Sequence, residues 1–297
     1  SIMSQSLFRG SGVALVTPMT PDGIDFPALE RLIEWHIASG TDALVLCATT
    51  GEGATLTYAE RAEIIERSVR QVNGRVPVIV GTGSNNTASA IALSREACAA
   101  GADGVLVVTP YYNKANEEGI YRHFATVADA VKIPCILYNV PGRTGCSISE
   151  ANVARLSKHP NIIDIKEASG NIEQLQELVR ITRGKTDVYL GEDSLTYLGM
   201  TLGSKGVISV AANVAPLLMR EITENAENGN YAAAREAQLK ALPLIRALFS
   251  EVNPIPVKKA MNFLGFDAGV PRLPLTEMEE AHAAALYGEM QALGLVK

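Results

Sequence analysis

Several features that mark special classes of protein are rare or missing in this 297-residue sequence. It has four cysteines, and none of them forms a C-x-x-C pair, so the sequence predicts neither a zinc site nor a disulfide framework. No apolar run approaches the ~18 residues of a membrane span, and the N-terminal "SIMSQSLF" lacks the layout of a signal peptide. We therefore expect a cytoplasmic protein with reduced thiols.

The sequence also lacks a basic run, because its charges are scattered and sum to -6. This disfavours nucleic acid or an anionic membrane as a partner and favours an enzyme that acts on small molecules. The run "GTGSNN" from Gly81 has Asn86 where a dinucleotide-binding loop needs its third glycine, so we interpret it as a turn and a helix N-cap. The four histidines show no ligand spacing, and no metal site is predicted.

What the sequence does contain is a repeated short run rich in Val, Ile and Leu, bounded by turn residues. Such runs are typical of strands that are buried on both faces of a parallel sheet. The eight runs are "GVALV" from Gly12, "DALVLC" from Asp42, "PVIVG" from Pro77, "DGVLVV" from Asp103, "PCILY" from Pro134, "IIDIK" from Ile162, "DVYLG" from Asp187 and "GVISV" from Gly206.

A segment of helical period follows each of these runs, for example Ile172, Leu175, Leu178 and Val179 after the sixth. Eight β-then-α units of this length predict a (β/α)8 TIM barrel, with a doubly wound open sheet as the alternative. The chain beyond the eighth unit is mainly helical in pattern. We predict a catalytic barrel over residues 1–225 and a small C-terminal helical region over residues 226–297.

Unusual polar residues gather where these strands end, which is the rim that holds the active site of such barrels. Lys166 ends the sixth run, after Ile162, Ile163 and Ile165. A free amine in so apolar a place can attack a ketone and form an iminium, which permits aldol chemistry without a metal. The alternatives are a lysine paired with Glu167 or Asp164, or one that reaches out to water.

Other polar side chains are expected near Lys166. Tyr138 ends the fifth strand and can carry protons if other hydroxyls relay them. Arg143, in the loop "PGRTG", can clamp a carboxylate. Asp164 is expected on the same strand face as Lys166, where its charge would favour the ammonium form. Hydroxyl groups at neighbouring strand ends are supplied by Thr49, Thr50, Tyr111 and Tyr112.

In this order the motifs resemble the dihydrodipicolinate synthase family, within the N-acetylneuraminate lyase superfamily of pyruvate-dependent class I aldolases. The resemblance runs from about Phe8 to the C-terminus. It rests on "VALVTPM", "TTGEGATL", "VIVGTG", "VTPYYN", "ILYNVPGRTG", "IKEASG", "GVISVAANV" and "NPIPVKKAM".

The resemblance implies condensation of pyruvate with L-aspartate 4-semialdehyde to 4-hydroxy-tetrahydrodipicolinate, a step of lysine and diaminopimelate biosynthesis. It implies a homotetramer built as a dimer of dimers, with no cofactor beyond the covalent Schiff base with pyruvate. Lys166 matches the Schiff-base lysine and Tyr138 the proton-shuttling tyrosine, and Thr49 and Tyr112 match the relay hydroxyls, Tyr112 acting in a neighbouring subunit. The residues that match substrate-binding positions are Thr50 and Arg143, with Gly191 and Ile208 contributing backbone.

The loops "PGRTG" and "TTGE" favour the synthase over the sialic acid lyases of the superfamily. A pyruvate-dependent aldolase acting on a keto-deoxy sugar acid or on sialic acid is the alternative. A catalytically silent barrel is disfavoured, because both the lysine and the tyrosine are present.

The resemblance also implies an effector site between subunits, where lysine-inhibited members carry histidine and glutamate ligands. The matching positions here hold Tyr58, Arg61 and Ser89, whereas Asn85 and Tyr111 still match. A lysine ammonium needs an anionic partner, so we predict weak or absent feedback inhibition.

Overall fold

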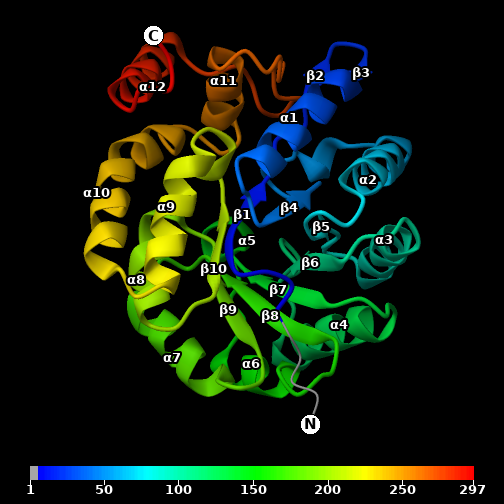
Figure 1. Cartoon of the computed structure of the whole chain (residues 1–297). Helices are drawn as coiled ribbons and strands as arrows, with labels where there is room; N and C mark the ends of the chain where they lie inside the picture. The colour runs from blue at the N-terminus through cyan, green and yellow to red at the C-terminus, as the bar shows by residue number, and fades with distance from the viewer. Residues whose placement is uncertain (1–5) are drawn as a thin grey trace.

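Within residues 6–297, which the computed structural model describes, eight parallel strands close into a barrel (Figure 1). Strand β1 hydrogen-bonds to both β4 and β10, which closes the sheet on itself. The predicted TIM barrel is confirmed, and the open-sheet alternative is wrong. The barrel strands are β1 (Gly10–Ala14), β4 (Ala43–Leu46), β5 (Val78–Gly81), β6 (Gly104–Val108), β7 (Cys135–Asn139), β8 (Ile162–Glu167), β9 (Asp187–Leu190) and β10 (Gly206–Ser209).

The strands are apolar along their whole length because both of their faces are buried. Alternate residues point to the barrel interior and to the surrounding helices. In β4, Val45 belongs to the interior cluster with Ile79, Leu106 and Ile136, whereas Leu44 packs in the outer layer. This explains why the strand runs show continuous hydrophobicity instead of alternation.

Helices cover the outside of the barrel, and several of them begin at a residue whose side chain caps the helix. Asn86 accepts a hydrogen bond from the backbone of Ala88, which confirms the predicted N-cap. The barrel helices are α1 (Phe26–Ala38), α2 (Tyr58–Val72), α3 (Thr87–Ala99), α4 (Glu117–Asp129), α5 (Pro141–Thr144), α6 (Glu150–Leu156), α7 (Ile172–Thr182), α8 (Thr196–Thr201) and α9 (Pro216–Glu227). The shorter elements are the hairpin β2 (Met19–Thr20) and β3 (Gly23–Ile24) and the 3-10 turns η1 (Gly53–Thr55), η2 (Asp193–Leu195) and η3 (Ala211–Asn213).

Three further helices follow the barrel: α10 (Tyr231–Leu248), α11 (Ile255–Phe263) and α12 (Glu280–Ala292). In Figure 1, α10 lies along the left side of the barrel, and α11 and α12 lie above it. This is the predicted C-terminal helical region. Since α9 ends at Glu227 and α10 begins at Tyr231, our division at residue 225 falls inside the last turn of α9 and stays a proposal.

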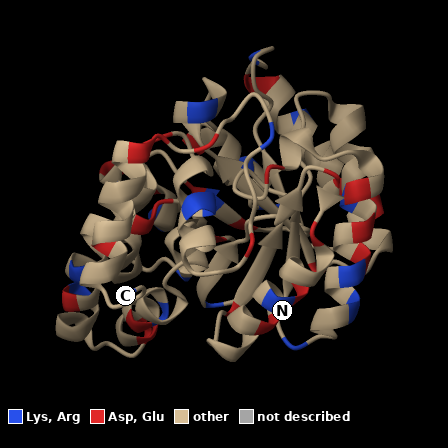
Figure 2. Ribbon diagram, turned by 90° about the horizontal axis from the view of Figure 1, so that it is seen from above, with Lys and Arg blue, Asp and Glu red and all other residues tan. Residues whose placement is uncertain are grey.

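Charged residues lie mainly on the outer helices and loops, with both signs interspersed, whereas the strands in the centre are almost free of them (Figure 2). In the part of the chain that the structure describes, no helix has both the length and the apolar character needed to cross a membrane.

Candidate active site

A cavity of about 540 Å³ lies at the carboxyl ends of the strands. Its lining includes Thr49 from the loop after β4, Tyr138 from β7 and Arg143 from α5. Because all barrel strands are parallel, residues far apart in the sequence meet at this one rim.

Lys166 lies beside the cavity, next to Tyr138. The two residues are register partners in the pairing of β7 with β8, so their side chains lie on the same face of the sheet. Lys166 is only 5% exposed, and its Nζ lies 4.0 Å from the centroid of the Tyr138 ring. An amine held this way is shielded from water and faces a phenol that can exchange protons.

The alternatives for Lys166 do not hold. Its burial rules out a side chain that reaches into water, and among residues 6–297 it forms no ion pair within 4.0 Å. Glu167 points to the other face of β8, where its carboxylate accepts hydrogen bonds from the Asn139 side chain at 3.1 Å and from the Ser169 backbone at 2.8 Å. Lys166 is therefore not committed to a structural ion pair.

Asp164 lies inside the barrel, one layer below Lys166 on the same strand. It is the register partner of Ile136, just as Lys166 is the partner of Tyr138. Burial, assisted by the nearby charge of Asp187, raises the pKa of Asp164 to about 8. The carboxyl group is thus mainly uncharged at neutral pH, so it does not present Lys166 with a full negative charge.

The loop after β4 brings Thr49 and Thr50 to the rim through a tight turn. Glu52 adopts a left-handed conformation with φ 57°, and its backbone N–H donates to the carbonyl of Thr49 at 3.0 Å. Thr50 is buried, and its hydroxyl accepts a hydrogen bond of 3.0 Å from the Asn253 side chain.

The remaining predicted substrate-binding residues lie at three other strand ends. Arg143 is exposed on α5, and its Nη2 donates to the carbonyl of Asn253 at 3.3 Å. Ile208 is buried in the interior cluster that contains Tyr138. Gly191 follows β9, and a Cβ atom there would lie 2.6 Å from the Cβ of Ala168, so no side chain fits. These residues share the rim, but the cavity lining includes only Arg143 among them.

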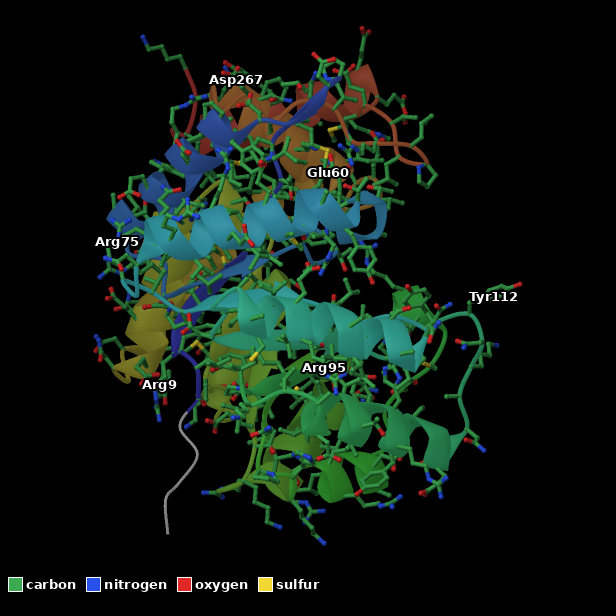
Figure 3. All side chains as sticks on the ribbon, turned by 90° about the vertical axis from the view of Figure 1, so that its right-hand side faces the viewer. Arg9, Glu60, Arg75, Arg95, Tyr112 and Asp267 are labelled. Atoms are coloured by element: carbon green, nitrogen blue, oxygen red, sulfur yellow. The ribbon has the colours of Figure 1, made fainter. Side chains whose placement is uncertain are left out.

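Within the single chain, Tyr112 lies apart from the other predicted site residues. It is 90% exposed, has φ 73° and projects away from the body of the molecule on the loop between β6 and α4 (Figure 3). Tyr111, by contrast, lines the cavity. Tyr112 is therefore absent from the lining of the cavity in its own chain.

The lining of the same cavity includes four of the predicted effector positions, Tyr58, Arg61, Ser89 and Tyr111, but not Asn85. Arg61 is buried and donates to the carbonyls of Cys47 at 3.4 Å and Gly81 at 2.6 Å. The cavity lining therefore carries the positively charged Arg61 at a position where the resemblance implies a site that binds a positively charged ligand.

Two polar residues of the site escaped the sequence analysis. Asn253 lies in the loop between α10 and α11 and begins "NPIPVKKAM", which we had quoted only as a motif of the family resemblance. Asp193, in the run "GEDS", is buried and accepts hydrogen bonds from the Ser209 hydroxyl and the backbone of Val210 and Ala211. Burial raises the pKa of Asp193, whereas these hydrogen bonds and the charge of Lys166 favour the carboxylate.

One group of possible metal ligands occurs elsewhere among the described residues, at the start of α12. The ligand atoms of Glu251, Glu279 and His282 lie within 4.8 Å of one another. Their contacts are those of a helix cap, because Glu251 accepts hydrogen bonds from the Glu279 backbone at 3.0 Å and from His282 at 2.8 Å.

The fold and this site define the class of protein. It is a TIM-barrel enzyme that holds a buried lysine beside a tyrosine at the carboxyl ends of its strands, the layout of a class I aldolase. Comparison with known proteins then gives the family. The sequence model of the Dihydrodipicolinate synthetase family matches residues 7–293, and the chain belongs to this family.

Individual relatives agree with this assignment. A 4-hydroxy-tetrahydrodipicolinate synthase from Thermoanaerobacter sp. is 48% identical over 292 residues, covering 98% of each chain. The crystal structure of dihydrodipicolinate synthase from Aquifex aeolicus has a TM-score of 0.95 at 44% identity, covering 97% of this chain and 99% of that one. The chloride-inhibited enzyme from Acinetobacter baumannii, solved in complex with pyruvate, has a TM-score of 0.95 at 43% identity and the same coverage.

Proposed function

We propose that this protein is a 4-hydroxy-tetrahydrodipicolinate synthase, which condenses pyruvate with L-aspartate 4-semialdehyde for lysine and diaminopimelate biosynthesis. The observation that carries the proposal is the buried Lys166, with its Nζ 4.0 Å from the ring centroid of Tyr138 beside a cavity that Arg143 also lines. The names of the relatives support the same reaction.

The reaction begins at Lys166. Its free amine attacks the keto carbon of pyruvate, and loss of one water leaves an iminium. Loss of a proton from the pyruvate methyl group gives an enamine, which forms a carbon–carbon bond to the aldehyde carbon of the second substrate. The amino group of that substrate then replaces Lys166 on the imine carbon, which closes the ring and frees the enzyme. The iminium itself accepts the electron pair, so no cofactor is required.

Tyr138 moves protons in this scheme, because its ring lies against Nζ of Lys166. Thr49, in the loop after β4, supplies a relay hydroxyl, because it lines the same cavity as Tyr138. Thr50 binds the carboxylate of pyruvate, Arg143 binds the carboxylate of the aldehyde substrate, and Gly191 and Ile208 line the pocket with backbone.

Tyr112 completes the relay of a second subunit in a homotetramer built as a dimer of dimers. Its 90% exposure and its projection from the chain support this role (Figure 3). A reducing compartment, the cytoplasm, suits the four free cysteines.

The covalent step is tested by borohydride reduction in the presence of pyruvate. Mass spectrometry should find one reduced pyruvyl adduct on Lys166, and a Lys166→Ala variant should stay unmodified. Lys205, which lies near the opposite end of the barrel, provides a matched control, because Lys205→Ala should leave the adduct intact. An unmodified wild-type protein would contradict the mechanism.

The second substrate is tested separately with a panel of aldehydes at saturating pyruvate. We expect aspartate semialdehyde to be condensed with the highest kcat/KM. A preference for sugar aldehydes or N-acetylmannosamine would instead establish the aldolase alternative.

The response to lysine as an inhibitor is expected to depend on Arg61, the cationic side chain at the predicted effector positions. We propose weak or absent inhibition by L-lysine, because the buried Arg61 repels an ammonium group and Ser89 provides no carboxylate. A micromolar inhibition constant for lysine would refute this. The Ser89→Glu variant restores an anionic partner and should be more sensitive to lysine than the wild type.

A further inference from the structure

The ends of β7 and β8 carry a second pair of facing residues beyond Tyr138 and Lys166, namely Asn139 and Glu167. These two are register partners, one position after the partners Tyr138 and Lys166. Because successive side chains on a strand point to opposite faces, Asn139 and Glu167 lie on the outer face of the barrel sheet. Both are buried, and neither belongs to the lining of the cavity. Any effect that they have on the reaction therefore acts through their neighbours on the two strands.

Hydrogen bonds join the side chains of Asn139 and Glu167. Nδ2 of Asn139 donates to Oε1 and Oε2 of Glu167 at 3.1 and 3.3 Å. Oδ1 of Asn139 accepts from the backbone N–H of Ile148 at 3.0 Å, in the segment between α5 and α6. Because one side of the amide faces a carboxylate and the other faces an N–H donor, both are satisfied in this orientation alone. Asn139 thus connects the end of β8 to the segment that follows α5, the helix that carries Arg143.

The carboxylate of Glu167 is held by uncharged donors. Its Oε1 also accepts from the Ser169 backbone at 2.8 Å, and Nε2 of Gln174 lies 3.5 Å from Oε2. Within residues 6–297, no Lys, Arg or His forms an ion pair with it within 4.0 Å. Burial raises the pKa of Glu167, whereas these hydrogen bonds favour the carboxylate. A buried carboxyl group without a cationic partner costs free energy, so its position next to Lys166 indicates a role that an apolar side chain cannot fill.

The pairing of β7 with β8 has an irregularity that gives such a link a purpose. Near the start of the two strands the register shifts by one residue, because Ile163 of β8 is skipped in the pairing. A bulge of this kind bends a strand and changes the direction of the side chains that follow it. The register at the other end therefore depends on contacts made there, where Nζ of Lys166 lies 4.0 Å from the ring centroid of Tyr138. The hydrogen bonds of Asn139 and Glu167 come directly after this contact on both strands.

We propose that Asn139 and Glu167 are positioning residues for the reaction at Lys166. Their hydrogen bonds hold the ends of β7 and β8 in the register that places Nζ of Lys166 against the ring of Tyr138, and they hold the segment after α5 on the same rim. This inference rests on the proposed function, because it concerns the formation of the imine between Lys166 and pyruvate. A small displacement of one strand end lowers the rate of a reaction between closely placed groups more than it weakens the binding of the substrate.

The test exchanges the donor and the acceptor of this link. Glu167→Gln has nearly the same shape as the wild type, but it replaces one carboxylate oxygen with an NH2 group that faces the NH2 group of Asn139. Asn139→Asp places two carboxylates against each other. The double variant Asn139→Asp/Glu167→Gln again pairs one amide with one carboxylate and keeps the net charge of the wild type, so it should restore the link.

The rate of imine formation is measured by reduction with borohydride at increasing times after the addition of pyruvate, and it needs no aldehyde. At saturating pyruvate, this rate should fall about tenfold or more in each single variant, and the double variant should be faster than both. The pyruvate concentration that gives half of the maximal rate should change by less than about twofold. Ser94→Ala is the control for lost stability, because it removes the buried hydrogen bond of 2.7 Å between Ser94 of α3 and Thr82 after β5. Its melting temperature should fall while its rate stays at that of the wild type.

Two results would overturn the inference. If both single variants formed the imine at the wild-type rate while their melting temperatures fell as in Ser94→Ala, the link would contribute to stability alone. If the double variant formed the imine no faster than the single variants, the pairing of a donor with an acceptor would not be what positions Lys166.

Circular dichroism shows whether each variant is folded. Glu167→Gln changes the shape least, and its comparison with the double variant is sufficient should Asn139→Asp not fold. Failure of the wild type to trap pyruvate would count against the proposed function, whereas a failure confined to the comparison of the variants counts against the pair of Asn139 and Glu167 alone.

Discussion

Lys258 provides a direct test of how the C-terminal helices are attached to the barrel. It lies on α11, and its Nζ is 2.5 Å from Oε2 of Glu52 in the loop after β4. The two side chains are only 1% and 3% exposed. Burial lowers the pKa of Lys258, and the charge of Glu52 offsets this only in part. The pair therefore stabilises the fold little as a whole, but each charge depends on the other.

Replacing Lys258 with Met leaves a buried carboxylate that, among residues 6–297, keeps only the Arg272 backbone N–H as a donor. Loss of one partner of a buried pair costs about 3–5 kcal/mol of unfolding free energy. For a chain of this size, 1 kcal/mol corresponds to about 2 °C, so the melting temperature of Lys258→Met should fall by at least about 6 °C.

The next residue along the helix is a matched control. Lys259 pairs with Glu277 at 2.9 Å, but the two side chains are 27% and 61% exposed. Such a pair contributes at most about 1 kcal/mol, so Lys259→Met should unfold close to the wild type. The double variant Glu52→Gln/Lys258→Met should be more stable than Lys258→Met, because it leaves no unpaired carboxylate.

Thermal unfolding followed by circular dichroism, together with denaturant titration, measures these differences. If Lys258→Met and Lys259→Met melted at the same temperature, the argument from burial would fail. A double variant that is less stable than Lys258→Met would show that Glu52 stabilises the loop by itself and not through its partner.

Three further predictions concern other parts of the chain. Because the pKa of Asp164 is raised to about 8, the folded state binds its proton more tightly than the unfolded state. The free energy of unfolding therefore decreases as the pH rises from about 4 through 8, the range between the unfolded and folded pKa values. The melting temperature of Asp164→Asn relative to the wild type should therefore rise across this window; a constant difference would contradict the assignment. Thr57 forms a capping box with Glu60 at the start of α2, so Thr57→Ala should lose about 1 kcal/mol in denaturant titration, whereas Thr57→Ser should not. Inactive Tyr112→Ala subunits refolded together with inactive Lys166→Ala subunits should regain part of the activity if Tyr112 acts in the site of the neighbouring subunit, because a mixed dimer then has one complete site. No recovery of activity would mean that Tyr112 acts within its own chain.

The barrel was predictable because its signal is local and repeated. Each strand run, such as "DALVLC", is buried on both faces, so its hydrophobicity is continuous, and each helix carries its own apolar stripe. Lys166 was predictable for a related reason, since a lysine at the end of such a run has to lie near the rim. Tyr138, Thr49 and Arg143 were also predicted from their positions at strand ends, and the resemblance added particular roles for them. Their roles remain predictions.

By itself, the sequence determined the order of strands and helices, the rim on which the polar residues collect, and the family. Only the tertiary structure decided which groups touch across long separations: Asn253 with Thr50, and Lys258 with Glu52. It also decided which groups are charged, because the pKa of Asp164 depends on its burial inside the closed barrel and on Asp187. Periodicity and composition report the surroundings of a residue along the chain, whereas hydrogen bonding and desolvation depend on neighbours that only folding brings together.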